Sequence, residues 1–69
     1  MSNNIIIRKD IDKMLFAMLG RVELVEDWWH TPNKAFDMQT PAGVYWSGEE
    51  GRHKVYNYVA GHALGGEYS

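Results

Sequence analysis

Two Thr-Pro pairs divide this chain of 69 residues into segments that cannot form one continuous helix. Proline lacks the amide hydrogen that a helix interior needs, and it pushes the preceding residue toward extended conformations. Pro32 therefore ends the apolar segment that closes with two adjacent tryptophans. Pro41 follows Thr40, and a threonine before a first-turn proline is a typical helix start. The sequence thus predicts a helix, a tight corner and a second helix around residues 28–41.

Before this corner, apolar residues recur at the spacing of one helix face in two runs. The first spans residues 7–19 and stops at Gly20, a residue suited to the left-handed conformation that ends helices. The second spans residues 22–29, with carboxylates on its opposite side. Adjacent tryptophans on a helix point about 100° apart, so Trp28 and Trp29 cannot share one core pocket. We expect Trp28 in the core and Trp29 toward a partner, with core positions for both as the alternative.

The turn between the two Thr-Pro pairs contains Asn33 and one large aromatic residue, Phe36. Asparagine side chains accept hydrogen bonds from nearby backbone amides, so Asn33 should cap the turn. Phe36 should pack back under the helices, because large apolar side chains are mostly buried.

Two further helices are expected after this turn. A short one starts at Thr40 and places either Tyr45 or Trp46 on its apolar side. The next is predicted to begin with a capping box, in which Ser47 is the N-cap and Glu50 reaches back to the backbone amide of Ser47. The apolar positions of this last helix are Val55, Tyr58, Val59 and His62 or Ala63.

Together these patterns predict an all-α fold, a small compact bundle of about four short helices with a proline-containing aromatic hinge. We expect a single domain over residues 1–69, with residues 1–4 frayed, 5–64 forming the helical core and 65–69 a tail. The composition supports folding, since 45% of the residues are apolar and 13% are aromatic. The predicted core consists of Leu15, Val25, Trp28, Phe36, Val44, Val55 and Val59.

Charge and composition argue against several classes of function. Seven lysines and arginines stand against nine aspartates and glutamates, and they are scattered, so we expect no nucleic acid as main ligand. Apolar runs are too short for a membrane span or a signal peptide, which favours a cytoplasmic protein. The chain has no cysteine, no histidine pair at metal-binding spacing and no nucleophile beside a base. We therefore expect no enzyme activity, no metal and no cofactor.

A series of short motifs runs through residues 28–69 in one uninterrupted register. Its members are Trp28 and Trp29, then Thr31, Pro32 and Asn33, then Phe36, then Thr40 and Pro41, then Ser47, Gly48, Glu49 and Gly51, then Val55, and finally Gly66, Glu67 and Tyr68. The series resembles the C-terminal toxin-binding domain of the Xre/MbcA/ParS family of antitoxins. That family carries Trp-Leu, Thr-Pro-Asn, an apolar residue, a second Thr-Pro, a glycine-containing capping turn, a helix with a central valine and a Gly-x-Tyr ending.

Two departures from the family pattern stand out. The family usually has glycines where this chain has Asp37 and Met38, and aspartate tolerates a left-handed backbone more readily than methionine does. Many family members also carry an N-terminal helix-turn-helix, for which residues 1–21 are too short. We therefore expect a module that binds a protein without binding DNA itself.

The resemblance implies a non-enzymatic module that neutralises a partner by occluding its active site. Family members bind toxins, often of the RES type that degrades NAD, and their C-terminal segment approaches the active-site cleft. Residues 65–69 would then form the plug, whereas the alternative is that Gly65 and Gly66 only cap the last helix and Tyr68 folds back on the core. The residues predicted to contact the partner are Trp29, Tyr45, Trp46, Gly65, Gly66, Glu67, Tyr68 and Ser69.

Two other functions remain open from the sequence. One is a phage-encoded, stand-alone inhibitor of a host or defence protein, which the missing DNA-binding half favours. The other is a self-associating accessory protein, whose exposed aromatic residues form the interface of a homo-oligomer.

Overall fold

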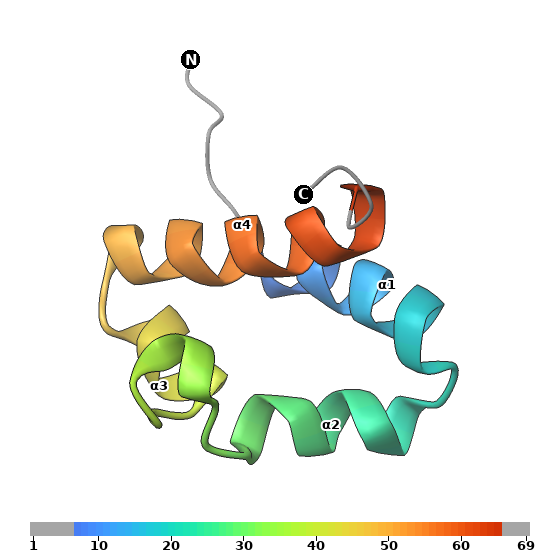
Figure 1. Cartoon of the computed structure of the whole chain (residues 1–69), viewed down its shortest axis with the longest axis horizontal. Helices are drawn as coiled ribbons and strands as arrows, with labels where there is room; N and C mark the ends of the chain where they lie inside the picture. Colours follow the sequence, from blue (N-terminus) through green and yellow to red (C-terminus); the bar gives the residue numbers. More distant parts are fainter. Residues whose placement is uncertain (1–6, 66–69) are drawn as a thin grey trace.

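Four α-helices and one short 3-10 helix make up the part of the chain that the structure, a computed structural model, describes (Figure 1). This part covers residues 7–65. The elements are α1 (Arg8–Leu19), α2 (Val22–His30), η1 (Lys34–Phe36), α3 (Pro41–Trp46) and α4 (Glu49–Gly65). No strand occurs in this range, where a single isolated β-bridge joins Asn33 and Gln39. The predicted small all-α bundle is confirmed.

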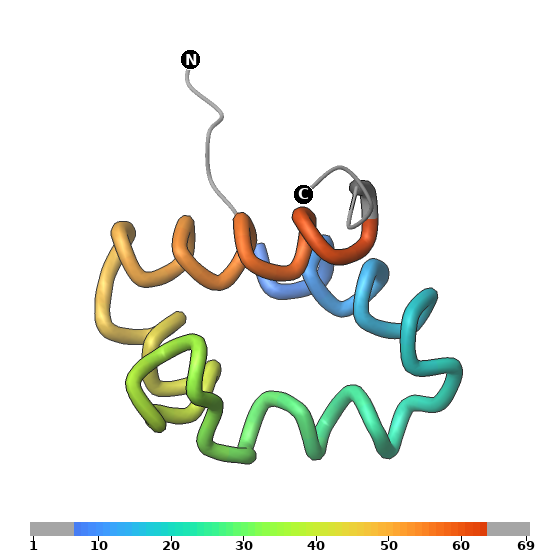
Figure 2. Tube along the Cα trace, viewed as in Figure 1, coloured from blue at the N-terminus to red at the C-terminus, as the bar shows by residue number. Residues whose placement is uncertain are grey.

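The four α-helices follow one another around a shared core. α1 contacts α2, α2 contacts α3, α3 contacts α4, and α4 returns to contact α1. Figure 2 shows this closed arrangement, with α4 uppermost among the helices, α1 descending from behind it to the right, α2 at the bottom, and α3 between the end of α2 and the start of α4. The first and last helices are therefore neighbours in space although they lie at opposite ends of the sequence.

Nine buried apolar side chains form the core. They are Ile11, Leu15, Val25, Trp29, Phe36, Val44, Tyr45, Val55 and Val59. Six of the seven predicted core residues are among these nine, and the exception is Trp28, which is half-buried and packs against the core from its edge. Trp29 takes the position expected for Trp28, with 0% of its surface exposed. The predicted assignment of the two tryptophans is thus reversed.

Three of the predicted capping residues, Gly20, Asn33 and Thr40, take their expected places. Gly20 follows α1 in the left-handed conformation, with φ 85°. At the start of α3, Thr40 Oγ1 accepts a hydrogen bond of 3.1 Å from the Gly43 amide. Asn33 Oδ1 caps η1 by accepting one of 2.9 Å from the Ala35 amide. These side chains satisfy backbone donors that have no partner within the helix itself.

The capping box predicted for the start of α4 is not formed. Ser47 has helical backbone angles, φ −75° and ψ −16°, whereas an N-cap residue is normally extended. Its Oγ donates instead to Val44 O, at 2.6 Å, and so closes the last turn of α3. Gly48, with φ 149°, makes the break between the helices, and α4 begins at Glu49. The capping roles predicted for Ser47 and Glu50 are therefore wrong.

The chain reverses after η1 through two consecutive residues with positive φ. Asp37 has φ 57° and Met38 has φ 67°. The backbone hydrogen bonds of the turn include those from Met38 N to Asn33 O, at 2.9 Å, and from Asn33 N to Gln39 O, at 3.1 Å. These are the positions at which the antitoxin family usually has glycine, and the left-handed backbone is formed here without it.

Met38→Gly should stabilise the protein by about 1 kcal/mol, because glycine adopts a positive φ without the steric cost of a Cβ. The Met38 side chain is 58% exposed, so its removal loses little packing. Asp37→Gly is the matched comparison and should gain less, since aspartate tolerates this region better. Urea unfolding followed by circular dichroism measures both changes. An unchanged or lower midpoint for Met38→Gly would contradict the prediction.

Candidate functional site

Trp46 is the most exposed large apolar side chain of the described residues, with 70% of its surface accessible. It sits at the end of α3, where its neighbours Val44 and Tyr45 are buried in the core. The indole packs edge-on against the Tyr45 ring, with the two ring centroids 5.2 Å apart. A large aromatic side chain held in place and left in water is typical of a contact point for another molecule.

Tyr45 connects this exposed tryptophan to the interior. Its ring packs edge-on against Trp29, with the centroids 5.6 Å apart. The guanidinium carbon of Arg52, on α4, lies 5.9 Å from the centre of the Tyr45 ring. α3 is therefore anchored through one aromatic side chain both to the core and to the helix that follows.

The corner between α3 and α4, residues 46–51, is closely packed at Gly51. A Cβ on this buried glycine would lie 1.9 Å from Val44 O and 2.5 Å from Ser47 Oγ. Side-chain carbons do not approach other heavy atoms so closely, so the two helices meet here at a distance that only glycine allows. The backbone next to Trp46 is therefore closely packed against the start of α4.

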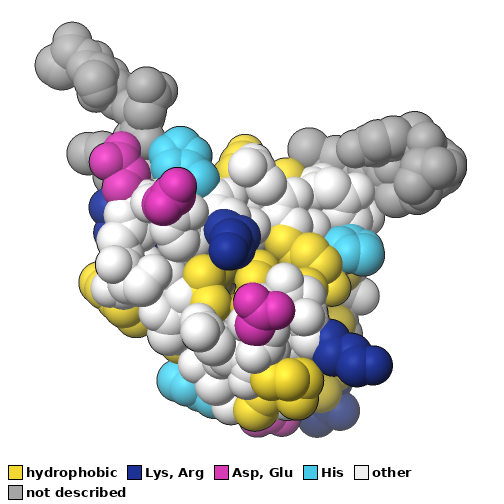
Figure 3. All heavy atoms as spheres, turned by 60° about the vertical axis from the view of Figure 1, so that its left-hand side comes forward, with side chains coloured by type: hydrophobic (Ala, Val, Ile, Leu, Met, Phe, Trp, Pro, Cys, Tyr) yellow, Lys and Arg dark blue, Asp and Glu magenta, His cyan; other side chains and the backbone are white. Residues whose placement is uncertain are grey.

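A hollow of about 520 Å³ lies beside the α3–α4 corner. Its lining residues, which define what we call the corner hollow, are Phe36, Asp37, Gln39, Val44, Ser47, Gly48, Glu49, Glu50, Gly51 and Lys54. Three carboxylates and one ammonium group thus surround a depression that also has apolar walls. Figure 3 shows the molecule from the side of α3 and the start of α4, where acidic, basic and apolar side chains alternate on the surface.

The charged groups of the corner hollow are not used in ion pairs within the described part of the chain. The ion pairs of residues 7–65 join Arg8 to Asp12 and Glu26, Arg21 to Glu23, and His30 to Glu26. Asp37, Glu49, Glu50 and Lys54 take part in none of them. Glu49 and Glu50 do complement the positive end of the α4 dipole, but their carboxylates remain open to a second contact.

Of the three predicted partner contacts whose burial the structure describes, Trp29, Tyr45 and Trp46, only Trp46 is exposed. Trp29 and Tyr45 are 0% and 5% exposed, so the prediction that they contact a partner is wrong. Gly65 is the last residue of α4. Gly66, Glu67, Tyr68 and Ser69 lie outside the described residues.

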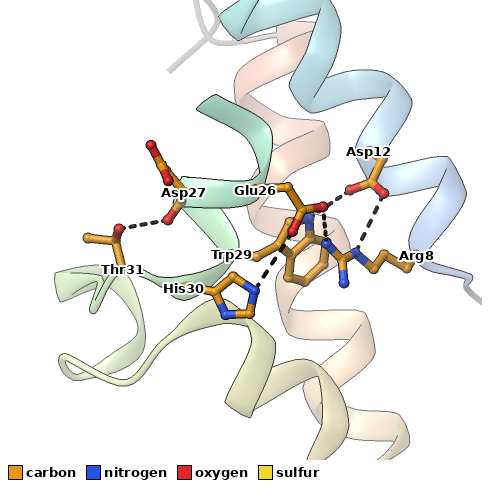
Figure 4. Close-up of polar contacts among 7 residues, drawn as sticks. All are labelled: Arg8, Asp12, Glu26, Asp27, Trp29, His30 and Thr31. Atoms are coloured by element: carbon orange, nitrogen blue, oxygen red, sulfur yellow. Dashed lines mark hydrogen bonds and ion pairs between the residues drawn. The ribbon is translucent and has the colours of Figure 1, made fainter. Parts of the chain in front are cut away.

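Trp29 is buried, and α1 supplies a partner for its ring nitrogen (Figure 4). Its Nε1 donates to Asp12 Oδ1 at 2.7 Å. The guanidinium carbon of Arg8 lies 4.6 Å from the centre of the indole, and Arg8 Nη2 donates to Glu26 Oε2 on α2 at 3.0 Å. These contacts clamp the start of α1 to the end of α2. We therefore assign the cluster to the fold and not to a binding site.

A second hollow, of about 180 Å³, opens between α1, α2 and α4. Its lining residues, which define the α1–α2–α4 groove, are Leu15, Met18, Leu19, Trp28, Tyr58, Val59 and His62. Apart from His62 and the hydroxyl of Tyr58, these side chains are predominantly apolar. The sequence did not predict the groove, because three helices contribute to it and each residue fits the ordinary pattern of a buried helix face.

Metal-binding clusters and membrane-spanning helices are both absent from residues 7–65. Among residues 7–65, no group of three or more histidine, cysteine, aspartate or glutamate side chains could hold a metal ion. In the same range, no helix combines the length and the apolar character needed to cross a bilayer.

Comparison with known proteins gives no match. No family model matches the chain, and neither does any curated protein or solved structure. The resemblance to the Xre/MbcA/ParS antitoxins therefore stays a prediction made from the motifs of residues 28–69.

Proposed function

We propose that this protein is a non-enzymatic module that binds a partner protein and neutralises it by occluding its active site. The observation that supports this most is Trp46, which is 70% exposed at the end of a helix fixed by its neighbours. Tryptophan is enriched among the residues that dominate the energy of protein interfaces. A side chain that is already held in place also loses less conformational entropy when a partner covers it.

The corner hollow supports the same proposal. Several of its lining residues directly follow Trp46 in the sequence. Phe36 and Val44 form part of its apolar wall, and Asp37, Glu49 and Glu50 contribute carboxylates. Interfaces commonly have an apolar centre and a polar rim, and complementary charges at the rim speed association and exclude wrong partners. A partner surface with an apolar centre and basic side chains around it would match this face.

The partner that we propose first is a cytoplasmic toxin, such as one of the RES type, in line with the motifs of residues 28–69. An inhibitor of a host or defence protein during phage infection would use the same face. Photo-crosslinking distinguishes the two, with a reactive amino acid placed at position 46 and the linked protein identified by mass spectrometry. Position 22 is the matched control, because Val22 is 64% exposed on a different helix. Crosslinking to the same protein from both positions would contradict a specific face at Trp46.

Trp46→Ala should weaken binding of the captured partner about 30-fold, which corresponds to about 2 kcal/mol for a central interface tryptophan. The free energy of unfolding should change by less than about 0.5 kcal/mol, because the side chain is mostly in water. Calorimetric titration with the purified partner measures the first effect and urea unfolding the second. Val22→Ala should alter neither, and equal affinity of Trp46→Ala and the unmodified chain would contradict the proposal.

Light scattering of the free chain tests the self-association alternative. A mass of one chain at all concentrations agrees with our proposal. If the unmodified chain has the mass of an oligomer and the Trp46→Ala variant has the mass of a monomer, Trp46 lies in a contact between copies of the chain instead.

A further inference from the structure

The corner hollow and the α1–α2–α4 groove adjoin each other across one group of aromatic rings. Phe36 lines the corner hollow, and Tyr58 lines the groove. Their rings pack edge-on, with the centroids 5.3 Å apart. The Phe36 ring also packs edge-on against Trp28, another lining residue of the groove, at 6.5 Å. The two hollows are therefore neighbours with these side chains as their common boundary.

One side of α4 runs along both hollows. Residues four positions apart are neighbours on a helix surface, and one such row consists of Glu50, Lys54, Tyr58 and His62. The first two line the corner hollow and the last two line the groove. Tyr58 is half-buried and the other three are exposed. The row is about 18 Å long, so one segment laid along this side of α4 can reach both hollows.

The corner hollow suits a cationic side chain. Asp37, Glu49 and Glu50 contribute three carboxylates and Lys54 one ammonium group, which leaves an excess of two negative charges. These groups are not used in ion pairs within residues 7–65. A guanidinium group donates several hydrogen bonds in one plane and matches the geometry of carboxylates better than an ammonium group does. Arginine is therefore the side chain that best complements this end of the row.

The α1–α2–α4 groove suits an aromatic ring. Leu15 and Val59, each 1% exposed, belong to its walls, while Met18 is 41% exposed at its edge. An apolar cavity of about 150 Å³ holds one benzene molecule. The groove, at about 180 Å³, has room for one such ring. The two ends of the row therefore differ in chemistry, one acidic and the other apolar.

We infer that the two hollows together bind an extended segment of the partner protein, with arginine at one end and an aromatic residue at the other. Extended chain advances about 3.3 Å per residue, so about six residues cover the length of the row. The arginine pairs with the carboxylates of the corner hollow, and the aromatic ring enters the groove beside Met18 and Tyr58. The inference rests on the proposed function, because it specifies the part of the partner that this protein recognises.

Charge complementarity selects this occupant over other segments. An acidic segment would be repelled by the carboxylates of the corner hollow, and a wholly apolar one would remove water from them without supplying a countercharge. A short basic segment without an aromatic residue would leave the groove unfilled. The arrangement thus recognises a combination of two side chains and the distance between them.

Two synthetic hexapeptides provide the test. Each is blocked at both ends and carries two arginines at one end, tryptophan at the other, and serine and glycine between them, and the two have opposite chain directions. In NMR spectra of the full chain, we expect one of them to shift the Met18 methyl signal and the Gly51 amide signal together. Replacing the tryptophan of the peptide by alanine should weaken binding about 10-fold. Replacing both arginines by glutamate should abolish it.

Four variants of the protein test the two ends separately. Glu50→Lys should weaken peptide binding about 10-fold, and its matched control is Glu23→Lys, which makes the same change of charge in the first turn of α2. Met18→Lys should also weaken it about 10-fold, because it places a charge at the edge of the groove. Its control is Phe16→Lys, since Phe16 is 49% exposed on the same helix and does not line the groove. All four positions are exposed, so each variant should keep its circular dichroism spectrum.

Three outcomes would overturn the inference. The first is that neither peptide shifts the signals of Met18 and Gly51 at about 1 mM. The second is equal affinity for the tryptophan and alanine peptides, which would mean that the groove is not used. The third is an equal loss of affinity in Glu50→Lys and Glu23→Lys, which would reduce the contact to general attraction between opposite charges.

The peptide experiment and the crosslinking experiment fail independently. Specific crosslinking at position 46 without peptide binding would overturn this inference and leave the proposed function standing. Peptide binding at both hollows without specific crosslinking at position 46 would overturn the binding face proposed at Trp46 and leave the peptide site standing.

Discussion

Trp29→Ala should destabilise the protein by about 3–5 kcal/mol, the largest effect that we expect from truncating one side chain. The indole is 0% exposed and packs edge-on against both Trp28 and Tyr45, with centroid distances of 5.4 and 5.6 Å. Its loss leaves a cavity at the centre of the core and removes the donor to Asp12 Oδ1. A domain of 69 residues has a total stability of roughly 3–10 kcal/mol, so a large part of the population should unfold.

The three tryptophans of the chain provide an internal comparison for this prediction. Trp28 is only half-buried, so we expect Trp28→Ala to cost about 1–2 kcal/mol, less than its predicted place in the core implies. Trp46→Ala should cost almost nothing. Urea unfolding followed by circular dichroism at 222 nm gives the order of the three variants. A greater loss for Trp28→Ala than for Trp29→Ala would contradict the core that we describe.

Gly51→Ala should destabilise the protein by about 3 kcal/mol, because the added methyl group cannot be placed without separating α3 from α4. The new Cβ would lie 1.9 Å from Val44 O, a backbone atom that cannot move alone, and 2.5 Å from Ser47 Oγ. The expected direction is the opposite of the usual one, since alanine is favoured over glycine by about 0.5–1 kcal/mol inside a helix. Thermal unfolding of the variant measures the effect.

Gly61→Ala is the matched control for Gly51→Ala. Both glycines lie in α4, but a Cβ at Gly61 would have nothing within 4 Å. The control should therefore raise stability by about 0.5–1 kcal/mol through helix propensity alone. Shifts of the same sign for the two variants would mean that α3 and α4 do not meet as closely as we describe.

Local signals predicted the helices well, because they depend on residues close in the sequence. Gly20, Asn33 and Thr40 were expected as caps, and each caps an element in the structure. The spacing of the apolar residues, together with the size of Phe36, also identified six of the nine core positions. Helix caps and apolar spacing depend on residues within one or two helical turns, so they can be recognised without knowing which distant segments pack together.

The assignment of the two tryptophans failed for a reason that lies outside α2. The apolar residues of α2 are compatible with two different buried faces. One contains Val22, Val25 and Trp28, and the other contains Val25 and Trp29. Asp12, 17 residues earlier, accepts the hydrogen bond of the Trp29 ring nitrogen and so favours Trp29 as the buried tryptophan. A periodic pattern within one helix cannot contain this information.

The candidate site was predictable only in part for the same reason. The exposure of Trp46 agrees with its place in the predicted partner-binding face, although one turn of sequence left the choice between Tyr45 and Trp46 open. The contact of Gly51 with α3 and the two hollows arise where separate segments meet. Their shapes depend on how closely these segments approach, and no single segment specifies that distance.

The return of α4 to α1 also determines when the protein can fold during its synthesis. α4 contributes the buried side chains of Val55 and Val59 to the core. A nascent chain that ends at α3 lacks them, so the apolar side chains of Ile11 and Leu15 stay exposed to water. Domains whose contacts join distant segments fold only after both segments are available. We therefore expect ribosome-bound chains to stay sensitive to proteases until α4 has emerged, and to become resistant in one step once it has.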